Sequence, residues 1–114
     1  MSDTCLFLGW KKPFEGRQKA AVELFGTFTG YLDQQCKAGA LESFEPVLLV
    51  PHGGDLNGFI VMRGEATKIE ALKRQPRFQE LVTQASICLE NYGLIEGRIG
   101  SGLEQQMKMY VKFV

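Results

Sequence analysis

The stretch 44–64 constrains the fold more than any other part of the chain. Within it, the runs 47–50 and 59–62 are rich in β-branched and aromatic residues, and a proline, glycine and aspartate cluster at 51–55 separates them. This pattern predicts an antiparallel hairpin with a connection longer than two residues. Neither run alternates between apolar and polar side chains as a strand with one wet face does. Both faces of these strands are therefore expected to be covered.

Periodic apolar residues predict the other elements of the chain. They indicate a strand at 4–10, a helix at 17–38, a helix at 67–90 that Pro76 interrupts, a strand at 94–100 and a terminal helix at 101–114. Segments 67–70 and 101–104 have the spacing of capping boxes, so their first residues are predicted to cap the helices that follow. Gly26 and Gly30 are expected to let the first helix approach a neighbour closely.

The predicted order is strand, helix, strand, strand, helix, strand, followed by an extra helix. This is the α+β, ferredoxin-like βαββαβ arrangement, an antiparallel sheet with both main helices on one face. Right-handed crossovers place the first and third strands in the centre. A length of 114 residues suits one domain, so 1–114 is expected to fold as a unit. The terminal helix carries an apolar stripe and must dock on its own chain or on a partner.

Two helices cover only one face of such a sheet. The opposite face would expose a broad apolar patch, and monomers rarely expose patches beyond roughly 300–600 Å². Packing two sheets face to face buries that patch. The sequence therefore predicts a homodimer in which two sheets form one barrel.

Charge and cysteine usage exclude several classes of partner. The formal net charge is zero, with 13 basic and 13 acidic residues, so neither nucleic acid nor an anionic membrane is an expected partner. The three cysteines are isolated and His52 is the only histidine, so no metal site is predicted. No signal peptide or membrane-length apolar stretch is recognised, and a reducing cytoplasm is the expected location.

His52 is the natural candidate for acid–base catalysis, because its unperturbed pKa lies near neutrality. It occurs in a Pro-His-Gly-Gly loop with no activated serine or cysteine context nearby. Asp55 in the same loop is equally typical of a turn. A lone histidine is not a motif, so we favour a structural role over a catalytic one.

Arg63, Glu96 and Arg98 form a second candidate site. If the isoleucines of 94–100 face the helices, alternation places these charged side chains on the opposite sheet face, in or beside the barrel cavity. There they would bind an acidic or carbonyl-bearing ligand, or form an ion pair that only fixes the dimer geometry, which we favour. Trp10 would supply a flat apolar wall beside them, or simply pack in the core at a strand end, the interpretation we favour.

The chain resembles the dimeric α+β barrel superfamily, which includes antibiotic-biosynthesis monooxygenase-like and stress-responsive barrel proteins. The resemblance rests on 58–61 followed by Gly64, on the interrupted helix with 75–79, and on 92–95 at the start of the last strand. It implies a homodimeric barrel with ligands between sheet and helices or inside the barrel. Some members are cofactor-free oxygenases acting on polycyclic aromatics and some bind haem. No residue set here matches a catalytic motif of that superfamily.

Two classes of function follow from the sequence and this resemblance. The first is a homodimeric barrel that binds a small aromatic or acidic ligand without catalysis. The second is an oxygenase or isomerase that uses the same cavity without a cofactor. A haem-dependent variant is disfavoured because the one histidine lies in a loop. No cofactor is predicted.

Overall fold

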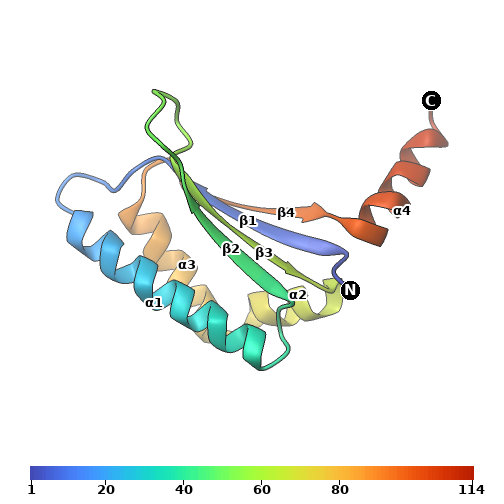
Figure 1. Ribbon diagram of the computed structural model, residues 1–114, viewed down its shortest axis with the longest axis horizontal. Coiled ribbons are helices and arrows are strands. Elements are labelled where there is room, and N and C mark those ends of the chain that lie inside the picture. The colour runs from blue at the N-terminus through green and yellow to red at the C-terminus, as the bar shows by residue number, and fades with distance from the viewer.

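The chain forms an α+β structure with one four-stranded antiparallel sheet. In chain order the computed structural model, which describes all residues 1–114, contains β1 (Thr4–Trp10), α1 (Gln18–Lys37), β2 (Ser43–Leu48), β3 (Gly58–Gly64), α2 (Ala66–Arg74), α3 (Pro76–Cys88), β4 (Gly93–Arg98) and α4 (Gly100–Val111). The strand order is β2-β3-β1-β4, so the first and third strands are central, as predicted. Helices α1, α2 and α3 cover one face of the sheet and leave the other free, while α4 projects beyond the end of β4 (Figure 1).

Strand β1 organises the core because every second side chain points under the helices. Leu6 and Leu8 are almost completely buried and lie opposite Met62 and Ile60 of β3. The core cluster comprises Leu6, Leu8, Trp10, Phe28, Leu32, Leu41, Ile60, Met62, Ile69, Leu72, Phe78 and Leu81. Burying a side chain of this kind stabilises the fold by about 1.5–3 kcal/mol. The intervening residues of β1 face the side without helices, so this strand is apolar on both faces, as expected.

Strand β2 begins and ends earlier than the sequence predicted. The predicted run 47–50 gives way to a strand at Ser43–Leu48, which pairs with β3 from Ser43 opposite Arg63 to Leu48 opposite Gly58. Glu45 and Pro46 were left out of the predicted strand because glutamate and proline are uncommon in strands. Proline is tolerated here because β2 is an edge strand.

The interruption of the second helical segment at Pro76 is confirmed. Pro76 occupies the first turn of α3, where its missing N–H leaves no hydrogen bond unmade, and Gln75 before it is extended. The Tyr31 hydroxyl of α1 donates a hydrogen bond to Gln75 Oε1, and Gln75 Nε2 donates one to Gln35 Oε1 at 3.1 Å. These contacts hold the break between α2 and α3 against α1. Burial raises the pKa of Tyr31, so its hydroxyl remains a donor at neutral pH.

Both predicted capping boxes are wrong. Helix α2 begins at Ala66, so Thr67 lies inside the helix and no side chain of its N-cap residue makes a capping bond. The helix is capped instead by a residue distant in sequence, because Asp3 Oδ1 accepts a hydrogen bond from the backbone N–H of Ala66 at 2.9 Å. Helix α4 begins at Gly100, which likewise places Ser101 inside the helix.

Gly26 and Gly30 do not mediate a close approach of α1 to a neighbour. A Cβ atom added at either position would meet nothing within 4 Å. The two glycines therefore face open space rather than the core.

No helix of the chain combines the length and the apolar composition that crossing a bilayer requires.

Candidate functional site

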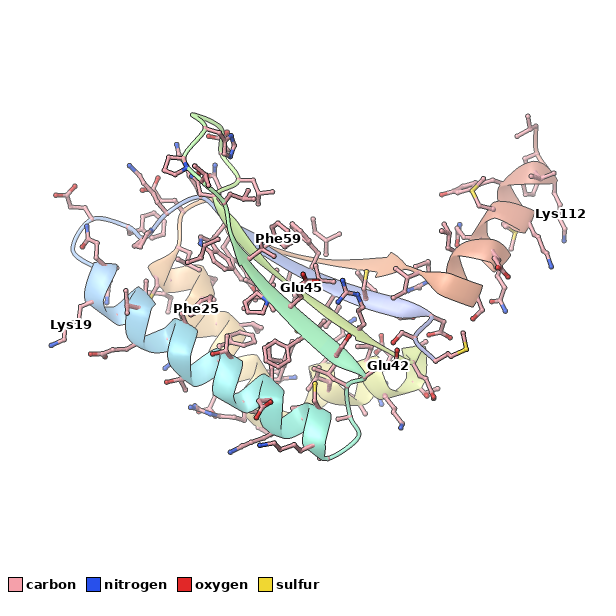
Figure 2. The ribbon with its side chains drawn as sticks, in the orientation of Figure 1. Lys19, Phe25, Glu42, Glu45, Phe59 and Lys112 are labelled. Carbon is pink, nitrogen blue, oxygen red and sulfur yellow. The ribbon has the colours of Figure 1, made fainter.

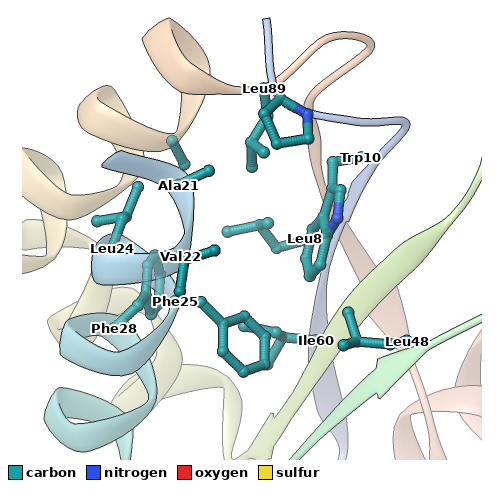
Figure 3. A pocket seen from close by; sticks show the side chains of 12 residues that line it. Leu8, Trp10, Ala21, Val22, Leu24, Phe25, Phe28, Leu48, Ile60 and Leu89 are labelled. Atoms are coloured by element: carbon teal, nitrogen blue, oxygen red, sulfur yellow. The ribbon is translucent and has the colours of Figure 1, made fainter. Parts of the chain in front are cut away.

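A pocket of about 300 Å³ lies between α1 and the sheet. Leu8 and Trp10 of β1 form one wall and Ala21, Phe25 and Phe28 of α1 form the facing wall (Figure 3). The pocket lies on the helix-covered side of the sheet, within one chain. It is therefore distinct from a cavity between two sheets.

Aromatic rings shape this pocket. The rings of Trp10 and Phe25 meet edge to face, with centroids 6.3 Å apart and an angle of 74° between their planes. The Trp10 ring lies against the backbone of β3 at Gly58, where a Cβ atom would stand 2.5 Å from ring atom Cζ2. Gly58 thus sets the position of the indole, because no larger residue leaves room for it.

No ionisable side chain lines the pocket. Its walls consist of aliphatic and aromatic residues with Pro13 at one side. A charged ligand would lose its hydration there without gaining an ion pair, which is costly. The site therefore favours a neutral, apolar molecule with flat faces.

The helix-free face of the sheet has an aromatic centre and a charged margin. Phe7 and Phe59 stack there, with centroids 5.0 Å apart, and both are only half-buried. Arg63 donates a hydrogen bond from Nη2 to Glu45 Oε1 at 3.2 Å on the same face. The placement predicted for Arg63, away from the helices, is confirmed. Figure 2 shows Phe59 on this side and Phe25 between the sheet and α1.

The placement predicted for Glu96 and Arg98 is wrong. Glu96 lies opposite Leu6 and Arg98 opposite Thr4, so both charged side chains belong to the helix-covered side. Ile95 instead occupies the open face, with 61% of its surface exposed. The isoleucine pattern misled the assignment because β4 is an edge strand, where the helix-covered side is open enough for charged groups.

Glu96 is the centre of an ion cluster between β4 and α2. Arg98 Nη1 donates to Glu96 Oε2 at 2.7 Å, and Lys73 Nζ of α2 donates to Glu96 Oε1 at 3.1 Å. Lys73 also contacts Glu70 at 3.2 Å. The hydrogen bonds from Arg98 and Lys73 lower the pKa of Glu96, because they stabilise its ionised form. This geometry attaches the sheet edge to α2.

Trp10 packs in the core at the end of β1, the interpretation favoured from the sequence, and is not grouped with these charged residues. Its side chain lies under α1 in the pocket wall, whereas Arg63 lies on the opposite face of the sheet. Alternation explains this, since Trp10 has the parity of Leu6 and Leu8. The four predicted ligand-binding residues therefore do not form one site.

His52 lies exposed in the loop between β2 and β3 and does not line the pocket. Its Nδ1 accepts the backbone N–H of Gly54 at 3.3 Å, and its Nε2 is 2.6 Å from the carbonyl oxygen of Leu56. An acceptor at Nδ1 requires the proton at Nε2, which then donates to Leu56. Both ring nitrogens thus serve the loop itself.

Comparison with known proteins shows the fold. No protein-family model and no curated protein matches the chain. A dimeric protein of unknown function and ferredoxin-like fold from Bacteroides fragilis NCTC 9343 matches with a TM-score of 0.60 and 8% identity, over 84% of this chain and 96% of that one. The fold is ferredoxin-like.

Two further solved structures have the same ferredoxin-like arrangement. An ethyl tert-butyl ether d (EthD) family protein from Bacillus halodurans C-125 matches with a TM-score of 0.64 and 12% identity, over 86% of this chain and 99% of that one. SnoaB, a cofactor-independent oxygenase from Streptomyces nogalater, matches with a TM-score of 0.51 and 13% identity, over 87% and 93%. These similarities show the fold that the resemblance implied. Nearly all of each solved structure is matched, whereas part of this chain has no counterpart.

The resemblance implied ligands between sheet and helices, but of the residues that line this pocket only Trp10 was named as a candidate from the sequence. Phe25 and Phe28 were visible only as part of an apolar helical stripe, which predicts core packing equally well. The sequence feature that could have indicated a pocket was the small size of the residues that lie beside these rings. Ala21 and Ala85 are small residues on the inward faces of two helices beside large aromatic rings, and they leave volume unfilled.

Proposed function

We propose that this protein is a homodimer in which each helix-side pocket binds a small, neutral, flat apolar molecule. The observation that carries this proposal is the pocket of about 300 Å³ between Trp10 and Phe25, bounded by apolar side chains and free of ionisable ones. An aromatic ligand suits these walls, because rings pack edge to face or offset against tryptophan and phenylalanine. The same walls disfavour an acidic ligand.

The helix-free sheet face supports the homodimer. Its centre consists of Phe7, Phe59, Val61 and Ile95, and no element of the chain covers it. Apolar sheet faces pack against one another at a separation of about 10 Å. The similar Bacteroides protein is described as dimeric. In such a dimer the ion pair of Arg63 and Glu45 would border the interface and fix its geometry.

Arg63, Glu96 and Arg98 act in this proposal as structural groups rather than ligand-binding ones. Each guanidinium already has a carboxylate partner, at 3.2 Å for Arg63 and 2.7 Å for Arg98. Trp10 alone among the predicted site residues contacts the ligand. The three cysteines are unpaired, in keeping with a reducing compartment such as the cytoplasm.

A cofactor-free oxygenase is the second candidate function. The similarity to SnoaB and the aromatic pocket favour it. Such a reaction needs a group that removes a proton from the substrate, and no ionisable side chain lines the pocket. Binding without turnover is therefore the better supported function.

Fluorescence of Trp10, the only tryptophan, tests the proposal directly. We expect 2-naphthol to quench it saturably and 2-naphthoate, with a charge on the same ring system, to bind much more weakly. Ala21→Leu fills the pocket and should abolish binding, whereas Ala20→Leu, at the neighbouring position outside the pocket, should not. Equal binding to both variants would contradict the proposed site. Oxygen uptake with an electron-rich polycyclic phenol would favour the oxygenase instead.

A further inference from the structure

Helix α4 is amphipathic and has no partner within its own chain. Its apolar stripe contains Leu103, Met107 and Tyr110, which are all at least half-exposed. Glu104 and Lys108 are four residues apart and lie off this stripe on a polar side of the helix, and Lys112 is its C-cap residue. No residue of the helix is buried, although its 12 residues span about 18 Å. Figure 1 shows it extending past the sheet, away from α1, α2 and α3.

The start of α4 is nevertheless fixed firmly. The N–H of Ile99 donates to the carbonyl oxygen of Asp3 at 3.1 Å. Gly100 has a φ of +52°, which favours glycine, and a Cβ atom there would stand 2.8 Å from the carbonyl oxygen of Ser2. At Gly102 the corresponding distance to the carbonyl oxygen of Asp3 is only 2.2 Å. These contacts hold the first turn on the N-terminal backbone and give the helix a defined direction.

A second unpartnered apolar surface surrounds the mouth of the pocket. Val22 of α1 and Leu48 of β2 line the pocket, yet 73% and 70% of their surfaces are exposed. Val50, two residues after Leu48, is 83% exposed. The site is thus closed by apolar walls at its base and open between apolar residues at its rim.

The two surfaces lie at diagonally opposite corners of the sheet. Strand β4, which leads into α4, is one edge, and β2, which carries Leu48, is the other. Arg98 at the end of β4 lies beside Thr4, where β1 begins. Leu48 at the end of β2 is in line with Gly58 and Trp10, where β1 ends. The other diagonal of the sheet joins its two remaining corners. A two-fold axis that runs along this diagonal, in the plane of the open face, places the α4 corner of one copy over the Leu48 corner of a second copy.

We propose that α4 of each copy packs over the pocket mouth of a second copy of this chain, so that each ligand site is completed by its partner. The proposal rests on the dimer and the pocket proposed above. A diagonal axis makes the strands of the two sheets cross at a steep angle, and near-orthogonal crossing is one of the two common ways in which sheets pack. The contact is isologous, because the same pair of surfaces meets twice.

The area needed for a stable dimer favours a second copy as the occupant. The open face has four strands about 4.8 Å apart and about six residues long, so it covers roughly 400 Å² in plan. Stable interfaces usually bury about 800 Å² per partner. Two exchanged helices would add to the accessible surface that the sheet faces bury. The solved structures leave 13–16% of this chain unmatched, as expected if a short element of this chain is an addition to the shared fold.

Disulfide trapping between two full-length variants tests the contact. Leu48→Cys and Tyr110→Cys are made separately, each with Cys5 and Cys36 changed to Ser, and mixed before mild oxidation. Cys88 is buried and stays. We expect a covalent dimer from the mixture and not from either variant alone, because each corner meets the opposite corner of its partner. Glu104→Cys, on the polar side of α4, is the matched control and should not cross-link to Leu48→Cys.

Three results would overturn the inference, and they are distinguishable. A dimer by light scattering without the specific cross-link would leave the open-face dimer intact and refute the position of α4. A monomer at micromolar concentration would refute the dimer itself. Co-sedimentation of the full chain with phosphatidylcholine and phosphatidylglycerol vesicles would assign the stripe of α4 to a lipid surface instead. Ligand binding by Trp10 fluorescence is measured alongside and reports separately on the pocket.

Discussion

Asp3 caps a helix that begins 63 residues later, because its Oδ1 accepts the backbone N–H of Ala66 at 2.9 Å. The same carboxylate oxygen accepts the hydroxyl of Thr4 at 3.1 Å, and the backbone carbonyl of Asp3 accepts the N–H of Ile99. One residue near the N-terminus therefore joins the starts of α2 and α4 to the central strand.

Replacing Asp3 by alanine should destabilise the protein by about 0.5–2 kcal/mol, the usual cost of losing a helix cap. Asp3→Asn keeps an oxygen acceptor and should cost clearly less. Urea denaturation monitored by circular dichroism measures both differences. If the two substitutions were equally costly, the charge rather than the hydrogen bond would be responsible, and the cap would be refuted.

Gly26→Ala and Gly30→Ala should each stabilise the protein by about 0.5–1 kcal/mol, because glycine inside a helix is that much less favourable than alanine. Open space around both positions means that the added methyl groups meet no neighbour. Gly102→Ala is the contrasting control, since its Cβ atom would stand 2.2 Å from a carbonyl oxygen. In thermal melts the melting temperature should therefore rise for Gly26→Ala and Gly30→Ala and fall for Gly102→Ala. Loss of stability in the Gly26 variant would mean that a partner occupies that face of α1.

Acid should weaken the attachment of β4 to α2. The hydrogen bonds from Arg98 and Lys73 place the folded-state pKa of Glu96 below its unfolded value. The stabilisation is therefore fully present above the ordinary glutamate pKa and is lost as pH falls through the folded-state value. Glu96→Gln should unfold at a lower urea concentration than the wild type at pH 7, and the difference should shrink as the pH falls below the ordinary glutamate pKa. A difference that persists unchanged in acid would show that ionisation of Glu96 contributes nothing.

Alternation along a strand predicts which residues share a face, but not which face that is. The sequence correctly grouped Glu96 with Arg98 and separated them from Ile95, yet the face was assigned from the isoleucines alone. The register decides it, because Glu96 lies opposite the buried Leu6. That pairing depends on contacts between distant segments, which local periodicity does not contain.

The elements themselves followed well from local patterns, and the pocket did not. Strand β1 and the break at Pro76 depend on signals within a few residues, and the central position of β3 follows from the element order together with right-handed crossovers. The cavity beside Trp10 depends on the volume that Ala21 and Ala85 leave between packed elements. Apolar residues around a cavity have the same sequence signature as apolar residues that fill a core.

Phe59→Asp should convert the dimer into a monomer. Phe59 stacks on Phe7 in the centre of the open face, so a carboxylate there would be desolvated without a partner when two sheets meet. Ile87→Asp is the matched control, because Ile87 is 53% exposed on α3, on the helix side of the sheet, and should leave the mass unchanged. Light scattering at micromolar concentration measures the mass, and circular dichroism checks that both variants remain folded. A folded Phe59→Asp variant that still has twice the chain mass would place the dimer interface elsewhere, and with it the route by which α4 reaches a neighbouring pocket.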